Sequence, residues 1–214
     1  RKGSLSLSLL NDEHVFGEES GAWLADVLDA GISSALVDSP WSAVTELRLA
    51  SQEGDKQLVI GDLAGAYLVP AFPALQRCNL DNVSVHGSAL FAGLAGSKTL
   101  QQLDVVHCKL DQVASAALKL LAFSATLTSL SLDTGPVSTC CLPSLPAALI
   151  SLHVKLTNHS LGSWEECITP EAASKLQHLA VPGDFSPGSL QWPALCTLSL
   201  PDAQLGQADV DQLL

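Results

Sequence analysis

The sequence predicts an α/β solenoid with a parallel β-sheet on its concave face. Helices, 3₁₀ turns and extended segments would return along the convex face. Three observations predict this fold: a Leu-x-x-Leu-x-Leu pattern occurs seven times, its starts are nearly evenly spaced, and helical patterns fall between copies. The chain has 214 residues, 47% hydrophobic and only 5% aromatic, which suits a continuous core of thin, repeated layers.

Each copy of the pattern marks one expected strand. With conservative apolar replacements, the copies begin at Val44, Leu75, Leu100, Leu127, Leu149, Leu176 and Leu195. Their starts are separated by 31, 25, 27, 22, 27 and 19 residues. Side chains alternate along a strand, so we expect the apolar residues of each copy to point into the core and the residues between them to point outward.

One copy carries a longer motif, because Leu100, Leu103, Val105, Cys108 and Leu110 match L-x-x-L-x-L-x-x-N/C-x-L. On these patterns the chain resembles the leucine-rich-repeat family over roughly residues 44 to 205, especially its cysteine-containing, intracellular types. The resemblance implies a leucine-rich-repeat solenoid. We expect an irregular one, because the turn position filled by Cys108 holds other residue types elsewhere: Gln52, Val83, Gly135, Thr157, Asp184 and Ala203.

The expected organisation has two parts. Residues 1–43 would form a divergent N-terminal repeat or cap, with a strand where Leu5, Leu7 and Leu9 alternate with serines. Residues 44–214 would form the solenoid of about seven repeats. The chain starts without Met and ends in what reads as a helix start, so we expect a longer protein. Before the first copy we also expect a loop at 11–19 and a helix at 22–28.

The segments between copies should carry the return path of each repeat. Residues 87–97 and 112–124 have helical patterns, and Thr169 followed by Pro170 predicts a capped helix start. Residues 50–74, which contain several glycines and prolines, would form the long insertion that makes the first spacing 31. Proline and glycine also predict extended or short 3₁₀ segments at 136–146 and 182–193.

Composition argues against several classes of ligand. A formal net charge of −12 repels phosphate backbones, so we expect no direct nucleic-acid binding. No apolar run is long enough for a membrane span. No pair of cysteines has C-x-x-C spacing, so neither a metal site nor any cofactor is expected. Most cysteines fall at or beside apolar positions, where buried thiols favour an intracellular location.

Catalytic motifs are also missing, and we predict that the chain is not an enzyme. Residues 93–99 resemble a phosphate-binding loop, but Ser97 separates the glycine from Lys98, and the segment precedes a strand. The chain has neither a G-x-S-x-G nor an H-E-x-x-H motif. His107 and Cys108 are adjacent, and neighbours on a strand point to opposite faces, which disfavours a dyad.

The variable strand positions give a candidate binding surface on the concave face. Its residues are polar and of mixed charge: Arg48, Arg77, Asn79, Asp81, Gln102, Asp104, His107, Ser131, Asp133, His153 and Lys155. The competing interpretation is a solvated sheet surface that contacts nothing, because binding hot spots favour aromatic residues and arginine.

Two functions remain open on the sequence. The preferred one is a noncatalytic protein-protein interaction or scaffold module, such as an accessory subunit of a large assembly. The alternative is a substrate-recognition module of a ubiquitin-ligase-type adaptor or another multidomain protein. Both need a protein partner, whose identity the sequence does not give.

Overall fold

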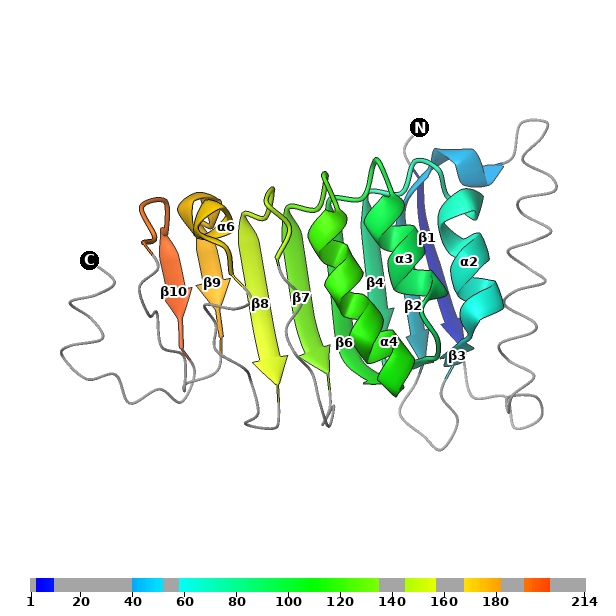
Figure 1. The fold of residues 1–214 in the computed structure, drawn as a ribbon. Helices are drawn as coiled ribbons and strands as arrows, with labels where there is room; N and C mark the ends of the chain where they lie inside the picture. The colour runs from blue at the N-terminus through cyan, green and yellow to red at the C-terminus, as the bar shows by residue number, and fades with distance from the viewer. Residues whose placement is uncertain are drawn as a thin grey trace.

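A computed structural model gives the fold of residues 3–9, 40–51, 58–134, 145–156, 168–181 and 191–200. These residues form an α/β structure built on a ten-stranded parallel β-sheet. The strands stand side by side in one long row, and the helices lie along one face of that row (Figure 1). We call the opposite face of the row, where no helix of the described residues lies, the helix-free face.

The main row contains a strand for each copy of the leucine pattern, in chain order. Its order is β1 (Gly3–Leu9), β2 (Val44–Ser51), β4 (Arg77–Asp81), β6 (Gln102–Leu110), β7 (Ser129–Thr134), β8 (Ser151–Leu156), β9 (His178–Ala180) and β10 (Thr197–Ser199). All of these neighbours pair in parallel. The strand predictions, including the one for Leu5 to Leu9, are therefore confirmed.

The helices occupy the return segments. They are α2 (Asp62–Ala71), α3 (Ala89–Gly96), α4 (Gln112–Ala117), the 3₁₀ helix η2 (Leu118–Phe123) that continues α4, and α6 (Pro170–Lys175). The helical predictions for 87–97 and 112–124 are confirmed. So is the cap before Pro170, because the Thr169 hydroxyl accepts a hydrogen bond from the Ala172 N–H at 3.2 Å. A further 3₁₀ turn, η1 (Pro40–Ala43), precedes β2.

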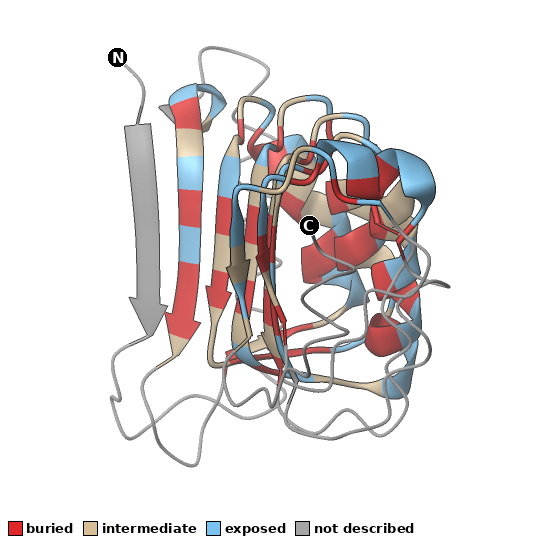
Figure 2. Cartoon of the chain, turned by 90° about the vertical axis from the view of Figure 1, so that its left-hand side faces the viewer, coloured by how far each residue is buried: buried red, intermediate tan, exposed pale blue. Residues whose placement is uncertain are grey.

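The core is a stack of aligned apolar rungs between the sheet and the helices. One rung joins six neighbouring strands, and each member is at most 1% exposed: Leu47, Cys78, Leu103, Leu130, Leu152 and Leu179. Figure 2 shows the alternation of buried and exposed residues along the strands. Burying one leucine side chain contributes roughly 1.5–3 kcal/mol, so these rungs are a main source of stability.

Two non-glycine residues turn the chain at the end of neighbouring strands. Asn82 follows β4 with φ of 54°, and His107 bends β6 with φ of 52°. Beyond these corners, β5 (Val83–Val85) pairs with the end of β6 and with β3 (Leu58–Ile60), beside the main row. Asparagine and histidine tolerate this left-handed conformation better than most residues. In these two units, the corner lets the chain leave the row and begin its return.

The turn position of the repeat motif lies just after each corner and is buried. Cys108 is 1% exposed and donates a hydrogen bond from Sγ to the Leu80 carbonyl at 3.4 Å, which joins two successive units. Val83, at the same position in the preceding unit, is fully buried and apolar. The remaining turn positions lie outside the described residues.

Residues 50–74 contain two elements that the sequence did not predict. They are β3, which pairs with β5 beside the main row, and the return helix α2. Gly65 has a packing role that its sequence does not reveal, because a Cβ there would lie 2.6 Å from the Leu90 backbone nitrogen of α3. Pro70 sits in the last turn of α2, where the helix is about to end.

Other expectations fall on parts of the chain that the structure does not describe. They include the loop at 11–19, the helix at 22–28, and most of the returns at 136–146 and 182–193. Among the described strands, β10 differs from the rest of the row. The apolar residues of its repeat, Leu195, Leu198 and Leu200, are only partly buried.

Candidate functional site

The outward side chains of the helix-free face form registered rows across the strands. The first row is Glu46, Arg77, Gln102, Ser129, Ser151, His178 and Thr197; the second is Arg48, Asn79, Asp104, Ser131, His153, Ala180 and Ser199. A third row is Ala50, Asp81, Val106, Asp133 and Lys155. Ten of the eleven candidate residues lie in these rows. The exception, His107, lies at the corner of β6.

A chain of ion pairs crosses the third row. Arg48 Nη2 lies 2.9 Å from Asp81 Oδ2, and Lys155 Nζ lies 3.5 Å from Asp133 Oδ2. His107 bridges the two carboxylates, with Nδ1 3.6 Å from Asp81 and Nε2 3.7 Å from Asp133. The bend at His107 brings its ring between carboxylates of two other strands, an arrangement that a regular strand pattern does not predict. Arg48, Asp81, Asp133 and Lys155 thus neutralise one another.

The first two rows offer groups with fewer partners. Arg77 is exposed, and no ion pair with Glu46, its neighbour in the row, forms in the structure. Gln102 Nε2 donates to Asp104 Oδ2 at 2.8 Å. Asn79 Oδ1 is buried and accepts no hydrogen bond. Around β4, this face therefore presents an exposed guanidinium group, while the amide oxygen of Asn79 beside it is out of reach of solvent.

The described part of the chain is electrically balanced. It holds seven acidic and seven basic side chains: Glu46, Asp62, Asp81, Asp104, Asp111, Asp133 and Glu171 against Arg48, Arg77, Lys98, Lys109, Lys119, Lys155 and Lys175. The net charge of −12 therefore comes entirely from residues outside it. The helix-free face is mixed in sign and is not an acidic surface.

The buried cysteines are poor nucleophiles. Burial, with smaller contributions from the Asp104 and Cys108 charges, raises the pKa of Cys78 to about 12. Burial also raises the pKa of Cys108 to about 11, against partly opposing backbone hydrogen bonds. Because the thiolate is the reactive form, both thiols are inert near neutral pH. Cys196, by contrast, is exposed, so two of the three described cysteines are buried.

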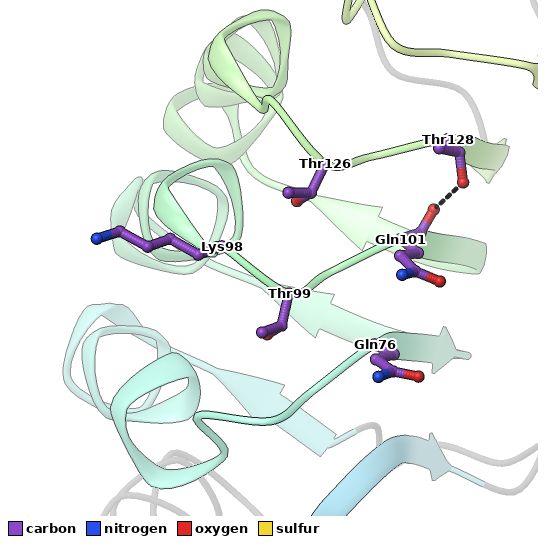
Figure 3. Close-up of a pocket in the computed structure, with 6 residues that line it drawn as sticks. All are labelled: Gln76, Lys98, Thr99, Gln101, Thr126 and Thr128. Carbon is purple, nitrogen blue, oxygen red and sulfur yellow. Dashed lines mark hydrogen bonds between the residues drawn. The ribbon is translucent and has the colours of Figure 1, made fainter.

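The sequence did not predict a second site, an open cavity of about 450 Å³ at the edge where the strands begin. Its walls come from residues just before β4, β6 and β7: Gln76, Lys98, Thr99, Gln101, Thr126 and Thr128 (Figure 3). Gln76, Gln101 and Thr128 hold the same place in successive units, the second position of the leucine pattern. This recurrence of polar residues at one position of the pattern is the sequence signal from which the cavity could have been predicted.

The structure gives no positive sign of metal or membrane chemistry in the region that it describes. No group of three or more His, Cys, Asp or Glu side chains there could hold a metal ion. No helix there is long and apolar enough to cross a membrane. Comparison of the chain with protein-family models, curated proteins and solved structures gave no significant match.

Proposed function

We propose that the chain is an irregular leucine-rich-repeat solenoid that acts as a noncatalytic protein-interaction or scaffold module, such as an accessory subunit of a large assembly. The observation that carries the proposal is the registered array on the helix-free face. Seven strands in chain order present their variable side chains in rows, one position from each repeat. Repeat proteins use such continuous surfaces to hold macromolecular partners.

The state of the side chains supports binding at a particular part of that face. In the third row, Arg48 pairs with Asp81 and Lys155 pairs with Asp133. These ion pairs fix that part of the surface but leave little charge for a partner. Arg77 on β4 is exposed and forms no ion pair with its row neighbour Glu46, and arginine is enriched in binding hot spots. We therefore place the centre of the contact at Arg77.

The test combines cross-linking with matched charge reversals. The full-length protein is purified from its native source with its partners, and cross-links to this chain are mapped by mass spectrometry. We expect them to cluster around the helix-free face. Arg77→Glu should weaken capture of the partner by at least about tenfold, because it removes a hot-spot arginine and adds repulsion.

Lys119→Glu provides the matched control, since Lys119 is exposed on η2 in the helix layer. It makes the same change of charge away from the proposed surface and should leave capture unchanged. Equal loss in both variants, or cross-links confined to the helix layer, would refute the assignment of this face. Melting temperatures of both variants should match that of the unmodified protein, since both side chains are exposed.

A further inference from the structure

The threonines and glutamines that line the cavity at the strand-start edge differ in the hydrogen bonds they can still offer a ligand. All three threonine hydroxyls donate inward to main-chain carbonyls: Thr99 to Pro73 at 3.2 Å, Thr126 to Ser97 at 3.2 Å, and Thr128 to Gln101 at 3.1 Å. Their remaining lone pairs can only accept. A ligand that uses these oxygens must therefore bring hydrogen-bond donors.

The two glutamines add groups of both kinds. Each carboxamide has two N–H donors and one acceptor oxygen. Neither amide makes a hydrogen bond within the described residues, whereas the main chain of Gln76 and Gln101 is fully used in the ladder between strands. Figure 3 shows the two side chains extending in the same direction from neighbouring strands, while Lys98 extends away from them.

This division of roles selects the chemistry of the ligand. An anion offers only acceptors and would meet the threonine lone pairs unfavourably, and an apolar group would leave both amides unsatisfied. An uncharged group that both donates and accepts can hydrogen-bond to the threonine oxygens and to both glutamine amides. Peptide groups do so, as do the hydroxyls of a neutral saccharide.

Exposed apolar side chains beside the cavity favour the peptide. Ile150 holds the place of Thr128 in the next unit, and its N–H donates to the Thr128 carbonyl at 2.8 Å. Its side chain is 37% exposed. Phe123 ends η2, shortly before Thr126, and is 80% exposed. These are two of the four large exposed apolar residues in the described chain. A peptide can place apolar side chains against both, whereas a sugar ring could stack on Phe123 but would find no aromatic face at Ile150.

We propose that this edge binds an uncharged, extended polypeptide segment of a partner protein. The main-chain groups of that segment would hydrogen-bond to the amides of Gln76 and Gln101, and its apolar side chains would lie toward Ile150 and Phe123. Strand neighbours are about 4.8 Å apart, so two amides one rung apart can meet successive polar groups of one extended segment. The cavity adjoins the first row of the helix-free face, because Gln76 and Gln101 directly precede Arg77 and Gln102 in the chain.

The experiment measures binding of the full chain to arrays of short capped peptides grouped as uncharged, acidic or basic. Affinity for the best uncharged peptide is then compared between the unmodified protein and Gln76→Met/Gln101→Met. We expect about a tenfold loss in the double variant, because it removes the two free amides at nearly constant side-chain volume. Gln112→Met, an exposed glutamine at the start of α4, is the matched control and should bind normally.

Nuclear magnetic resonance then locates the contact directly. The side-chain NH₂ signals of Gln76 and Gln101 should shift saturably with the selected peptide and should not shift with maltohexaose or inorganic phosphate. Shifts with maltohexaose and none with the peptide would overturn the proposal and identify the ligand as a saccharide. Selection of only charged peptides, or an unchanged affinity in the folded double variant, would overturn the proposal. Arg77→Glu changes a charge that an uncharged peptide does not need, so it should weaken this binding far less than Gln76→Met/Gln101→Met; that difference distinguishes failure of this proposal from failure of the helix-free face.

Discussion

At the scale of single residues, Asp111 joins two successive units through its carboxylate. Oδ1 accepts from the Ala114 N–H at 2.6 Å and caps α4, while Oδ2 accepts from the Gly87 N–H at 3.1 Å in the preceding unit. Burial alone would raise the pKa of Asp111, but the backbone donors Ala114 and Gly87, with nearby His86, outweigh it and lower the pKa. The ionised side chain therefore stabilises the fold.

We predict that Asp111→Ala lowers the free energy of unfolding by about 1–2 kcal/mol, the range for lost helix caps. Because the folded pKa is depressed, the contribution of Asp111 is present above the ordinary carboxyl pKa and is lost as pH falls through the folded value. Urea titrations at neutral and acidic pH check both points. The difference between the two proteins should shrink at acidic pH; a constant difference would contradict the charged cap.

The buried thiols predict the opposite dependence at alkaline pH. The pKa of Cys78 is raised to about 12 and that of Cys108 to about 11, so the unfolded chain loses these protons near pH 9 while the folded protein keeps them. Their contribution to stability is complete below pH 9 and is lost as pH rises toward those values. Urea titrations from pH 8 upward should show this decline.

A variant tests whether Cys78 is a cause of that decline. Cys78→Val keeps an apolar side chain of similar size in the rung but cannot ionise. Its stability should fall less steeply above pH 9 than that of the unmodified protein. In the native state, a thiol reagent near neutral pH should modify Cys196, which is exposed, well before Cys78 or Cys108. Rapid modification of Cys78 would contradict its burial.

At the scale of elements, helix packing depends on a glycine. In α2, a Cβ on Gly65 would lie 2.6 Å from the Leu90 nitrogen and 3.0 Å from its Cα, both backbone atoms of α3. Neither atom can move aside as a flexible side chain would. Gly65→Ala should therefore push the two helices apart and destabilise the protein by about 1–3 kcal/mol, as overpacking does elsewhere.

Gly96→Ala is the control for this prediction. Gly96 ends α3, and a Cβ there would meet nothing within 4 Å. The same substitution should leave stability unchanged or raise it slightly, because alanine favours helix. Thermal unfolding of both variants gives the comparison. A stable Gly65→Ala protein would show that α2 and α3 do not pack as closely as the structure places them.

The elements that sequence predicts well are those with a repeated pattern. The strands follow from leucines at fixed positions, and the α4 and η2 return follows from an apolar stripe of helical spacing. The helix α2 was not predicted because glycine and proline are unfavourable inside helices, although Gly65 packs against α3 and Pro70 lies in the last turn. Tertiary contact overrode local propensity in this segment.

The candidate surface was predictable only in outline. Strand alternation placed Arg77 and Asp104 on one face, and registration across the sheet follows from the equal lengths of the patterns. The position of His107 between Asp81 and Asp133 depends on its φ of 52°, which no spacing reveals. The edge cavity depends on three units together, so no single copy of the pattern contains it.

At the scale of the whole molecule, burial of the leucine rungs changes along the stack. Leu103 lies in the middle of the row with neighbours on both sides and is fully buried. Leu198, at the equivalent position of β10, pairs with Leu179 on one side and is only partly buried. Because repeat proteins are stabilised by each unit and its neighbours, the same substitution should cost different amounts at these positions.

We predict that Leu103→Asp destabilises the protein severely, by at least about 4 kcal/mol, because it places an unpaired carboxylate inside the stack. Leu198→Asp should cost much less, since its side chain reaches solvent. Hydrogen exchange should show faster opening confined to β10 in that variant, whereas Leu103→Asp should raise exchange across β4, β6 and β7 or prevent folding. Equal effects of the two substitutions would contradict the stacked arrangement, because they would show that the last strand is buried as deeply as the middle of the row.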